Sequence, residues 1–335
     1  MFNWKWYLKD LKPPDKNIKV FSMFSCGGGS SMGYKRAGFD VIGNLELDPK
    51  INKIYIKNLN PKFNFNMDIR DFNKLDNLPA ELYNLDILDG SPPCTPFSMV
   101  GNREEGWNKY KKFQEGQKLQ RLDDLFFVFL DTIEKLRPKI IIAENVTGII
   151  KGNAKGYVNE IIHRFHQLGY NLQMFQLNAA LMDVPQVRER VFFIANNQHY
   201  PKLKLDFHGD LIPFGKVRTK DGKPLIKKIT AKRLEFLLPT DMCIGDIVKR
   251  TENKENNFSN MIYWDNRVAF TIVSSGIHIR ANDKKRLSVG DFINCSSFPQ
   301  DYDFCNKQAQ FICGMCVPPN MMANLAIEIY NQWLN

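Results

Sequence analysis

A single cysteine, Cys94, follows two prolines at the end of a short apolar run in LDILDGSPPCTPFS, residues 85–98. The run predicts a buried strand, and Pro92 and Pro93 end it because proline donates no ladder hydrogen bond and restricts the residue before it. Cys94 is therefore expected on a stiff loop at the carboxyl end of a strand. Two roles fit this position: an ionised nucleophile, or the small half-buried hydrophobe that most cysteines are.

A glycine-rich stretch, FSCGGGSSMG at 24–33, follows the first apolar run and opens a helical pattern. Glycines let a ligand approach the backbone closely, and the later Glu46 is placed to accept hydrogen bonds from ribose hydroxyls. The stretch therefore indicates an adenosine-bearing cofactor, with a ligand-free glycine turn as the alternative. A nicotinamide cofactor is disfavoured, because G-x-G-x-x-G counted from Gly27 would require glycine at Met32.

Polar residues adjoin three other apolar runs. Asp68 closes NFNMDI, where it can bind an adenine amino group or cap a helix. Glu144 lies near the end of IIIAEN, where a carboxylate is either a helix cap or a group held for hydrogen bonding and proton transfer. Gln186, Arg188 and Arg190 alternate into the run VFFIAN, so we expect them to share one face of a strand, with a salt-bridged edge strand as the alternative.

Short apolar runs that alternate with helical patterns must position these residues. We predict strands at 18–25, 39–46, 85–90, 139–145, 172–178 and 190–196, and helices at 30–37, 49–58, 121–136 and 156–168. This alternation predicts a parallel sheet with helices on both faces, and such sheets bind ligands at the carboxyl ends of their strands. Cys94, Glu46 and Glu144 all lie at such predicted ends.

The alternation weakens after Asn196. Between Gln198 and Arg280, 15 Lys and Arg stand against 9 Asp and Glu, in a chain whose net charge is +10. This basic segment favours an anionic partner, or it is plain solubilising charge. We predict four parts: an N-terminal extension (1–17), a catalytic and cofactor-binding domain (18–197), a smaller domain (198–284), and a C-terminal segment (285–335) whose final helix returns to the catalytic domain.

The cysteines bear on compartment and on metal binding. Their number, seven, is odd, and the charged start of the chain does not read as a signal segment, so we expect a reduced cytoplasmic protein. Cys313 and Cys316 have the spacing of half a zinc site, but no second pair or nearby histidine accompanies them, and we expect no metal. The sequence has no run of 18 apolar residues, so we expect no membrane span.

Four of these stretches resemble, in order, the signatures of the cytosine-5 DNA methyltransferase family. They are the glycine loop, the Pro-Cys that ends at Cys94, the Glu-Asn-Val of 144–146 and the Gln-x-Arg-x-Arg of 186–190. The segments KRLSVGDFINCSSFP (285–299) and GMCVPPNMMANLAIEI (314–329) match less well. The chain departs from the family's usual residues at Cys26 (glycine), Gly290-Asp291 (Arg-Glu), Asn294-Cys295-Ser296 (Arg-Leu-Gln) and Gly314-Met315 (Gly-Asn).

The resemblance implies an α/β fold: a Rossmann-like sheet of the S-adenosylmethionine-dependent methyltransferases with helices on both faces, plus a smaller target-recognition domain at 198–284. It assigns catalysis to Cys94, Glu144, Arg188 and Arg190. It assigns S-adenosyl-L-methionine to Phe24, Ser25, Cys26, Gly27, Gly28, Gly29, Glu46, Leu47, Asp68, Ile69 and Pro92. Cys94 would add to C6 of a flipped-out cytosine, with Glu144 at N3, Arg190 at the O2 side and Arg188 bracing the nucleophile loop.

The resemblance also implies partners and rivals. We expect double-stranded DNA as substrate, bound by a bacterial, DNA-associated monomer, with a cognate restriction endonuclease as a further partner. The segment 98–121, with glycines at three positions and several lysines, fits a loop that closes over DNA. The alternatives are a tRNA cytosine-5 methyltransferase, a catalytically impaired DNA-binding homologue and a nicotinamide oxidoreductase. The basic insertion favours DNA over tRNA.

Overall fold

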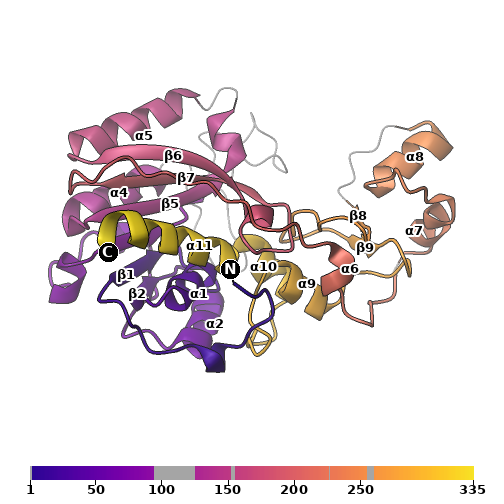
Figure 1. The fold of residues 1–335 in the computed structure, drawn as a ribbon, viewed down its shortest axis with the longest axis horizontal. Helices are drawn as coiled ribbons and strands as arrows, with labels where there is room; N and C mark the ends of the chain where they lie inside the picture. Colours follow the sequence, from indigo (N-terminus) through magenta and orange to yellow (C-terminus); the bar gives the residue numbers. More distant parts are fainter. Residues whose placement is uncertain (1, 94–124, 152–154, 226, 255–259) are drawn as a thin grey trace. The chain divides into compact units, whose positions relative to one another are not determined.

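The structure is a computed structural model that describes residues 2–93, 125–151, 155–225, 227–254 and 260–335 (Figure 1). Cys94 and the predicted closing loop 98–121 lie outside the described residues. The chain forms two compact units. Unit 1 comprises Met1–Asp10, Ala179–Arg188 and Phe207–Met321, and unit 2 comprises Leu11–Asn178, Glu189–Asp206 and Met322–Asn335.

Unit 2 is built on a seven-stranded sheet in the order β3-β2-β1-β4-β5-β7-β6. Its strands are β1 (Lys19–Met23), β2 (Asp40–Leu45), β3 (Phe63–Phe65), β4 (Ile87–Gly90), β5 (Ile140–Val146), β6 (Asn171–Asn178) and β7 (Glu189–Asn196). The five strands from β3 to β5 are parallel, as predicted. The prediction was wrong for β7, which runs antiparallel to both β5 and β6.

Helices cover both faces of this sheet. They are α1 (Gly29–Arg36), α2 (Pro49–Leu59), α3 (Ile69–Phe72), α4 (Leu125–Leu136) and α5 (Lys155–Gln167), with short 3-10 turns η2 (Ala80–Tyr83) and η4 (Thr147–Ile150). Alternate strand side chains point to opposite faces, so Phe21, Leu88 and Ile141 form one core with α4 and α5. Glycine is required at position 90, because a Cβ there would lie 2.6 Å from the Phe129 ring.

The C-terminal end of the chain packs on unit 2. Helix α11 (Pro319–Ile329) is followed by a π-helical turn, η8 (Tyr330–Leu334). The Trp333 indole donates to the Pro201 carbonyl and stacks against Tyr200, and Tyr330 lies against Phe39. The stretch Ala309–Leu334 is long and apolar enough to cross a membrane by composition, yet 72% of its most apolar window is buried, as in a core helix.

Unit 1 is smaller and mostly helical. Its elements are η1 (Leu8–Asp10), η6 (Ala179–Leu181), α6 (Phe214–Val217), α7 (Lys228–Arg233), η7 (Leu234–Phe236), α8 (Ile244–Glu252), β8 (Met261–Tyr263), β9 (His278–Arg280), α9 (Val289–Cys295) and α10 (Ala309–Met315). Strands β8 and β9 pair in parallel. A local core that includes Leu234 of η7, Ile247 of α8 and Ile279 of β9 joins these elements.

The units divide the chain differently from the predicted domains. The segment Ala179–Arg188 and everything from Phe207 to Met321 group together, so the predicted boundary at residue 284 is not a boundary between units. The N-terminal segment also joins unit 1: the Trp6 indole donates to the Ser297 carbonyl, and the Leu8 amide donates to Asp301. The motif at 285–299 therefore packs within the same unit as the basic segment before it.

Candidate active site at the carboxyl ends of the strands

Glu144 and Arg190 form an ion pair at the end of the sheet. Arg190 Nε lies 2.9 Å from Glu144 Oε1, and both side chains are largely buried. Burial lowers the pKa of the Arg190 guanidinium from its usual value, and the charge of Glu144 acts in the opposite direction. A fixed carboxyl beside a guanidinium can hold the two neighbouring polar atoms of a planar base. The structure thus brings together two of the four predicted catalytic residues.

The strand that carries Glu144 is tied to the loop that leads to Cys94. Asn145 Nδ2 donates to the Pro92 carbonyl at 3.2 Å, and its Oδ1 accepts from the Val146 amide. Asn145 is buried, so this contact fixes the residue two positions before the cysteine. The sequence prediction quoted Asn145 but gave it no role. The sequence feature that could have indicated a role for Asn145 is a polar amide side chain at the end of an apolar run.

Glu46 holds the glycine loop in place at the end of β2. Its Oε2 accepts from the Cys26 amide at 2.8 Å and its Oε1 accepts from the Asp48 amide at 2.9 Å. Burial raises the pKa of the Glu46 carboxyl to about 7, against the lowering by these two hydrogen bonds. Each carboxylate oxygen can accept a further hydrogen bond, so the group fits a ligand that presents hydroxyl donors, such as a ribose.

The loop between β1 and α1 has an unusual backbone. Phe24, Cys26 and Gly28 all have positive φ, at 52°, 44° and 81°. The structure also explains Gly28, because a Cβ there would lie 2.3 Å from a Leu59 methyl group. Cys26 accepts the strain that a glycine would avoid, since few non-glycine residues adopt this region. The chain therefore keeps the loop conformation while departing from the family's glycine.

Three other predicted cofactor residues are placed less directly. Strand β3 ends at Phe65, so Asp68 does not close it; instead Asp68 caps α3 by accepting from the Arg70 amide at 2.8 Å. Ile69 is buried in the core of unit 2. Leu47 presents its carbonyl to the side chain of Asn66 at 3.1 Å. Of the two roles predicted for Asp68, the helix cap is confirmed, whereas its predicted position at the end of a strand was wrong because strand pairing stops at Phe65.

Burial alternates along the stretch from Gln186 to Arg190, the pattern expected of side chains that share one face. Gln186, Arg188 and Arg190 are buried or partly buried, whereas Val187 and Glu189 between them are exposed. Strand β7 begins at Glu189, so only Arg190 of the three lies in a described strand.

Gln186 and Arg188 belong to unit 1, where the Arg188 guanidinium donates to the carbonyls of Ile272, Gly314 and Cys316. These described contacts make Arg188 a cross-link inside unit 1. The predicted role of Arg188 in bracing the loop of Cys94 involves residues outside those that the structure describes.

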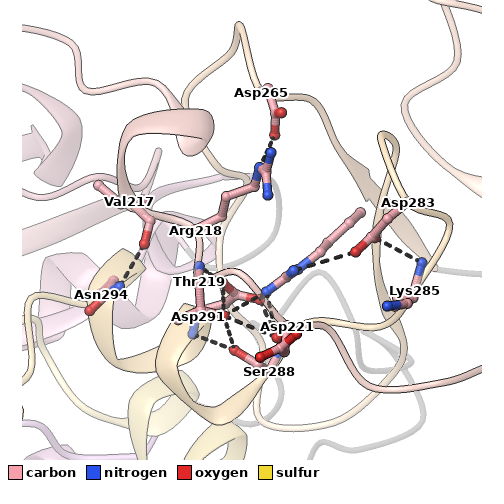
Figure 2. Close-up of polar contacts among 11 residues, drawn as sticks. Val217, Arg218, Thr219, Asp221, Asp265, Asp283, Lys285, Ser288, Asp291 and Asn294 are labelled. Carbon is pink, nitrogen blue, oxygen red and sulfur yellow. Dashed lines mark hydrogen bonds and ion pairs between the residues drawn. The ribbon is translucent and has the colours of Figure 1, made fainter.

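A buried ion pair organises the motif at 285–299 (Figure 2). Arg280 Nε donates to Asp291 Oδ2 at 2.8 Å, and both side chains are fully buried. Asp291 also accepts from the amides of Thr219 and Ser288 at 2.8 Å each. Gly290 leaves room for Thr219, whose methyl group would lie 2.5 Å from a Cβ. The departure at Gly290 is thus matched by the close approach of Thr219.

The sequence prediction missed a row of polar side chains across the sheet. Ser22 of β1 pairs in register with Asn44 of β2 and with Asp89 of β4, so all three point to one face. Ser22 and Tyr34 donate to the Asp89 carboxylate at 2.7 and 3.2 Å. Burial raises the pKa of Asp89 to about 7. The sequence feature that could have revealed these residues is a polar side chain inside each of three strands, because buried parallel strands are usually continuously apolar.

Comparison with known proteins identifies the family. The family model of C-5 cytosine-specific DNA methylases matches residues 18–271. The type II methyltransferase M.FnuDI of Fusobacterium nucleatum is 33% identical over 320 residues, with 86% of each chain covered. The type II methyltransferase M.NgoPII of Neisseria gonorrhoeae is 25% identical, with 93% of this chain and 95% of the relative covered.

Solved structures share the fold. A DNA modification methyltransferase encoded within a prophage of E. coli aligns with a TM-score of 0.68 and 18% identity, covering 95% of this chain and all of the other. A DNMT2 variant from Spodoptera frugiperda aligns with a TM-score of 0.64 and 17% identity, covering 94% of this chain and all of the other. The chain belongs to the C-5 cytosine-specific DNA methylase family and is a DNA cytosine-5 methyltransferase whose methyl donor is S-adenosylmethionine.

Proposed function

We propose that the enzyme acts through a covalent adduct between Cys94 and C6 of a cytosine held against Glu144 and Arg190. The Glu144–Arg190 ion pair carries this proposal, because it sets a carboxyl on β5 and a guanidinium on β7 side by side, and β5 is tied to the loop that leads to Cys94. Addition of the Cys94 thiolate to C6 moves the C5–C6 π electrons to C5, which makes C5 nucleophilic. S-adenosylmethionine, when bound, would supply the electrophilic methyl group to this carbon and leave as S-adenosylhomocysteine. Loss of the C5 proton then re-forms the double bond and expels the thiolate.

Glu144 and Arg190 have separate roles in this proposal. In its protonated form Glu144 donates its proton to N3 as charge develops on the ring, and Arg190 binds the neighbouring O2. Asn145 keeps the strand and the loop at a fixed separation through the Pro92 carbonyl. Because C5 and C6 are closed off in a stacked duplex, the cytosine must swing out of the helix, which costs a few kcal/mol.

The cofactor site in this proposal lies between the glycine loop and Glu46. Glu46 accepts hydrogen bonds from ribose hydroxyls with the lone pairs that the Cys26 and Asp48 amides leave free. Asp68 uses Oδ1 to cap α3, and its Oδ2 lies 3.2 Å from the Arg70 guanidinium. If Asp68 also binds the adenine amino group, its carboxylate accepts from the adenine and from Arg70 at the same time. Pro92 and the loop glycines supply backbone at the same strand ends.

The target-recognition role is proposed for the basic residues 198–284, which belong to unit 1 from Phe207 onward. We further propose that the protein works as a monomer on double-stranded DNA in the bacterial cytoplasm. The names of its relatives as type II methyltransferases favour a cognate restriction endonuclease that acts on the same sequence. We propose that Arg188 braces the nucleophile loop, in addition to its described contacts with the Ile272 and Cys316 carbonyls inside unit 1.

A covalent trap tests the mechanism. Duplex DNA that contains 5-fluorocytosine has no C5 proton to lose, so incubation with the protein and S-adenosylmethionine should give a complex that survives denaturing electrophoresis. Cys94→Ser should give no such complex, whereas Cys305→Ser should give as much as the parent. An equal yield from Cys94→Ser and the parent would exclude Cys94 as the nucleophile.

A further inference from the structure

Asp89 is a buried carboxylic acid in the middle of the seven-stranded sheet. It lies in β4, between β1 and β5, and it is 2% exposed. Its Oδ2 accepts from Ser22 Oγ at 2.7 Å, and its Oδ1 accepts from the Tyr34 hydroxyl at 3.2 Å. Asp89 forms no ion pair with the residues that the structure describes, so within that part of the chain two hydroxyl groups hold its carboxyl and no cation offsets its charge.

Asp86, three residues earlier, is a buried carboxylate with a more usual set of partners. It accepts from the Lys19 amide at 2.8 Å and lies 2.7 Å from Lys139 Nζ, so a cation offsets its charge. Burying a carboxylate without a cation costs more than burying a paired one. An apolar residue is also the usual choice inside a buried parallel strand. Fold stability therefore does not explain the carboxyl of Asp89.

The Asp89 carboxyl joins three elements close to the start of the loop that leads to Cys94. Ser22 belongs to β1 and Tyr34 to α1, and Asp89 is the last residue but one of β4. Pro92, three positions further on, is held through its carbonyl by Asn145 of β5. The stem of the loop is thus fixed at two points, and proline restricts the backbone between the second point and Cys94.

Asp89 and Glu144 lie on the same face of the sheet. Asp89 pairs in register with Ile142, and Glu144 is two positions further along β5, so the two carboxyl groups point to one side. The pKa of Asp89 is raised to about 7, mainly by burial, and the charge of Glu144 acts in the same direction. The charge of a proposed catalytic residue therefore reaches Asp89, which places this carboxyl beside the site.

We propose that Asp89 is a positioning residue for methyl transfer, which holds β4 to β1 and α1 so that the loop after it presents Cys94 to C6 of the cytosine. The proposal rests on the nucleophile role proposed above for Cys94. Asp89 itself does not contact the substrate, and it acts through the backbone of residues 90–93. Misplacing a reacting atom by about 1 Å can cost about 100-fold in rate, so a small shift of this stem has a measurable effect.

The rate of adduct formation with 5-fluorocytosine DNA, in single turnover at saturating DNA and S-adenosylmethionine, tests the proposal. Asp89→Asn keeps the size of the side chain but replaces one acceptor oxygen with a donor group, which disrupts one of the two hydroxyl contacts. The saturated rate should fall about tenfold, while the dissociation constants for S-adenosylhomocysteine and for DNA stay within twofold of the parent. A general loss of folded protein would instead lower the amplitude of the reaction.

Tyr34→Phe is the milder variant, because it removes one hydroxyl and keeps the ring. It should lower the saturated rate several-fold. In the double variant with Asp89→Asn, the loss should be smaller than the product of the two single effects, since both act through one carboxyl group. Should Asp89→Asn fail to fold, Tyr34→Phe still decides, because a parental rate in this variant would overturn the proposal.

Asp86→Asn is the matched control, since it alters a second buried carboxyl of the same segment at the amino end of β4. It should lower the thermal unfolding midpoint, because Lys139 loses its charged partner. Its saturated rate of adduct formation should stay within twofold of the parent. The two variants therefore differ in rate, although both replace a buried aspartate by asparagine.

The outcomes separate this inference from the proposed function. A parental rate in Asp89→Asn would overturn the positioning role, and so would equal slowing in Asp86→Asn. A loss that is explained by weaker binding of S-adenosylhomocysteine would also overturn it, because Asp89 would then act on cofactor affinity. A parent protein that forms no adduct at all would instead contradict the role of Cys94, and with it this inference.

Discussion

Glu144 and Arg190 are diagonal neighbours across the antiparallel pair formed by β5 and β7, because Glu144 pairs with Phe192 and Val146 pairs with Arg190. The direction of β7 decides this contact. In an antiparallel pair, the first residues of β7 lie beside the last residues of β5, which places Arg190 at the carboxyl end of the sheet. A parallel β7 would have carried Arg190 to the opposite edge, away from Glu144.

The first prediction concerns this ion pair. Glu144→Gln should lower the rate of methyl transfer by at least 100-fold, because an amide cannot supply the proton that cytosine N3 requires. Its affinity for S-adenosylhomocysteine should stay within twofold of the parent. Single-turnover assays and calorimetry measure the two effects. A variant that keeps more than a tenth of the parent's rate would contradict the role of Glu144 at N3.

The second prediction concerns the partner residue. Arg190→Met leaves the buried Glu144 carboxylate without its cation, and breaking a buried pair costs about 3–5 kcal/mol of unfolding free energy. The matched control is Arg164→Met, which breaks the more exposed pair with Glu134 and should cost at most about 1 kcal/mol. Urea unfolding of both variants gives the comparison. Equal losses of unfolding free energy in the two variants would show that burial does not make the Glu144–Arg190 pair contribute more to stability than an exposed pair.

The third prediction concerns the pH dependence of cofactor binding. The pKa of Glu46 is raised to about 7 by burial, so its carboxyl ionises as the pH rises through neutrality. The ionised form is the better acceptor for ribose hydroxyls, and affinity for S-adenosylhomocysteine should therefore increase between pH 6 and pH 8. Glu46→Gln should bind about tenfold more weakly at pH 8 and lose the pH dependence. An unchanged pH profile in this variant would assign the titration to another group.

The sequence allowed the strand positions to be predicted well because apolar runs mark buried strands directly. Lys19–Met23, Asp40–Leu45 and Ile140–Val146 all fall within or beside the predicted ranges. Strand direction could not be predicted in this way, since a run such as VFFIAN has the same pattern whichever way it pairs. The direction of β7 depends on its pairing with both β5 and β6, which is a property of the assembled sheet.

In the candidate site, too, local sequence patterns predicted some features, whereas features that depend on the folded chain could not be predicted. Glu46 and Glu144 were predictable because each is a carboxylate at the end of an apolar run. The described contacts of Arg188 were not, because they include the carbonyls of Ile272, Gly314 and Cys316, up to 128 residues away in sequence. Backbone carbonyls carry no residue-type signal, so a contact between a side chain and a carbonyl leaves no matching pattern elsewhere in the chain.

The fourth prediction concerns acid stability of unit 1. His278 is buried, and burial lowers its pKa to about 4 from the ordinary value of 6.5. Between pH 6.5 and about pH 4, His278 is protonated in the unfolded chain but stays neutral in the folded chain. The free energy of unfolding therefore decreases as the pH falls from 6.5 to about 4. Between pH 7 and pH 5 the loss should be about 2 kcal/mol.

His278→Phe tests this prediction, because it keeps a ring in place and removes the titrating group. The Tyr263 hydroxyl, 2.7 Å from His278 Nδ1, also lies 3.3 Å from the Phe270 carbonyl and so retains an acceptor. Urea unfolding followed by tryptophan fluorescence at pH 7 and pH 5 should show the loss in the parent and not in the variant. A loss of the same size in both would point to other groups.

The last prediction concerns target choice by residues 198–284. Basic side chains here fall into two sets. Arg218 and Arg250 are ion-paired with Asp265 and Asp241, whereas Lys216, Lys227 and Lys228 are exposed and form no ion pair with the described residues. Loss of a phosphate contact from such a lysine weakens binding evenly across sequences and reduces its salt dependence, whereas loss of a base contact changes preference at one position by about 1–3 kcal/mol.

Exposed apolar side chains of the same segment are the candidates for base contact. Phe236, in η7, and Met242, just before α8, are 59% and 50% exposed, and apolar groups can read the thymine methyl in the major groove. We expect Lys227→Ala and Lys228→Ala to lower methylation of a random duplex library evenly. Phe236→Ala or Met242→Ala should relax the preference at one position, as read by sequencing the methylated cytosines. If all four variants kept the parent's target sequence and lost only overall activity, this segment would serve as a phosphate clamp and the choice of sequence would lie elsewhere.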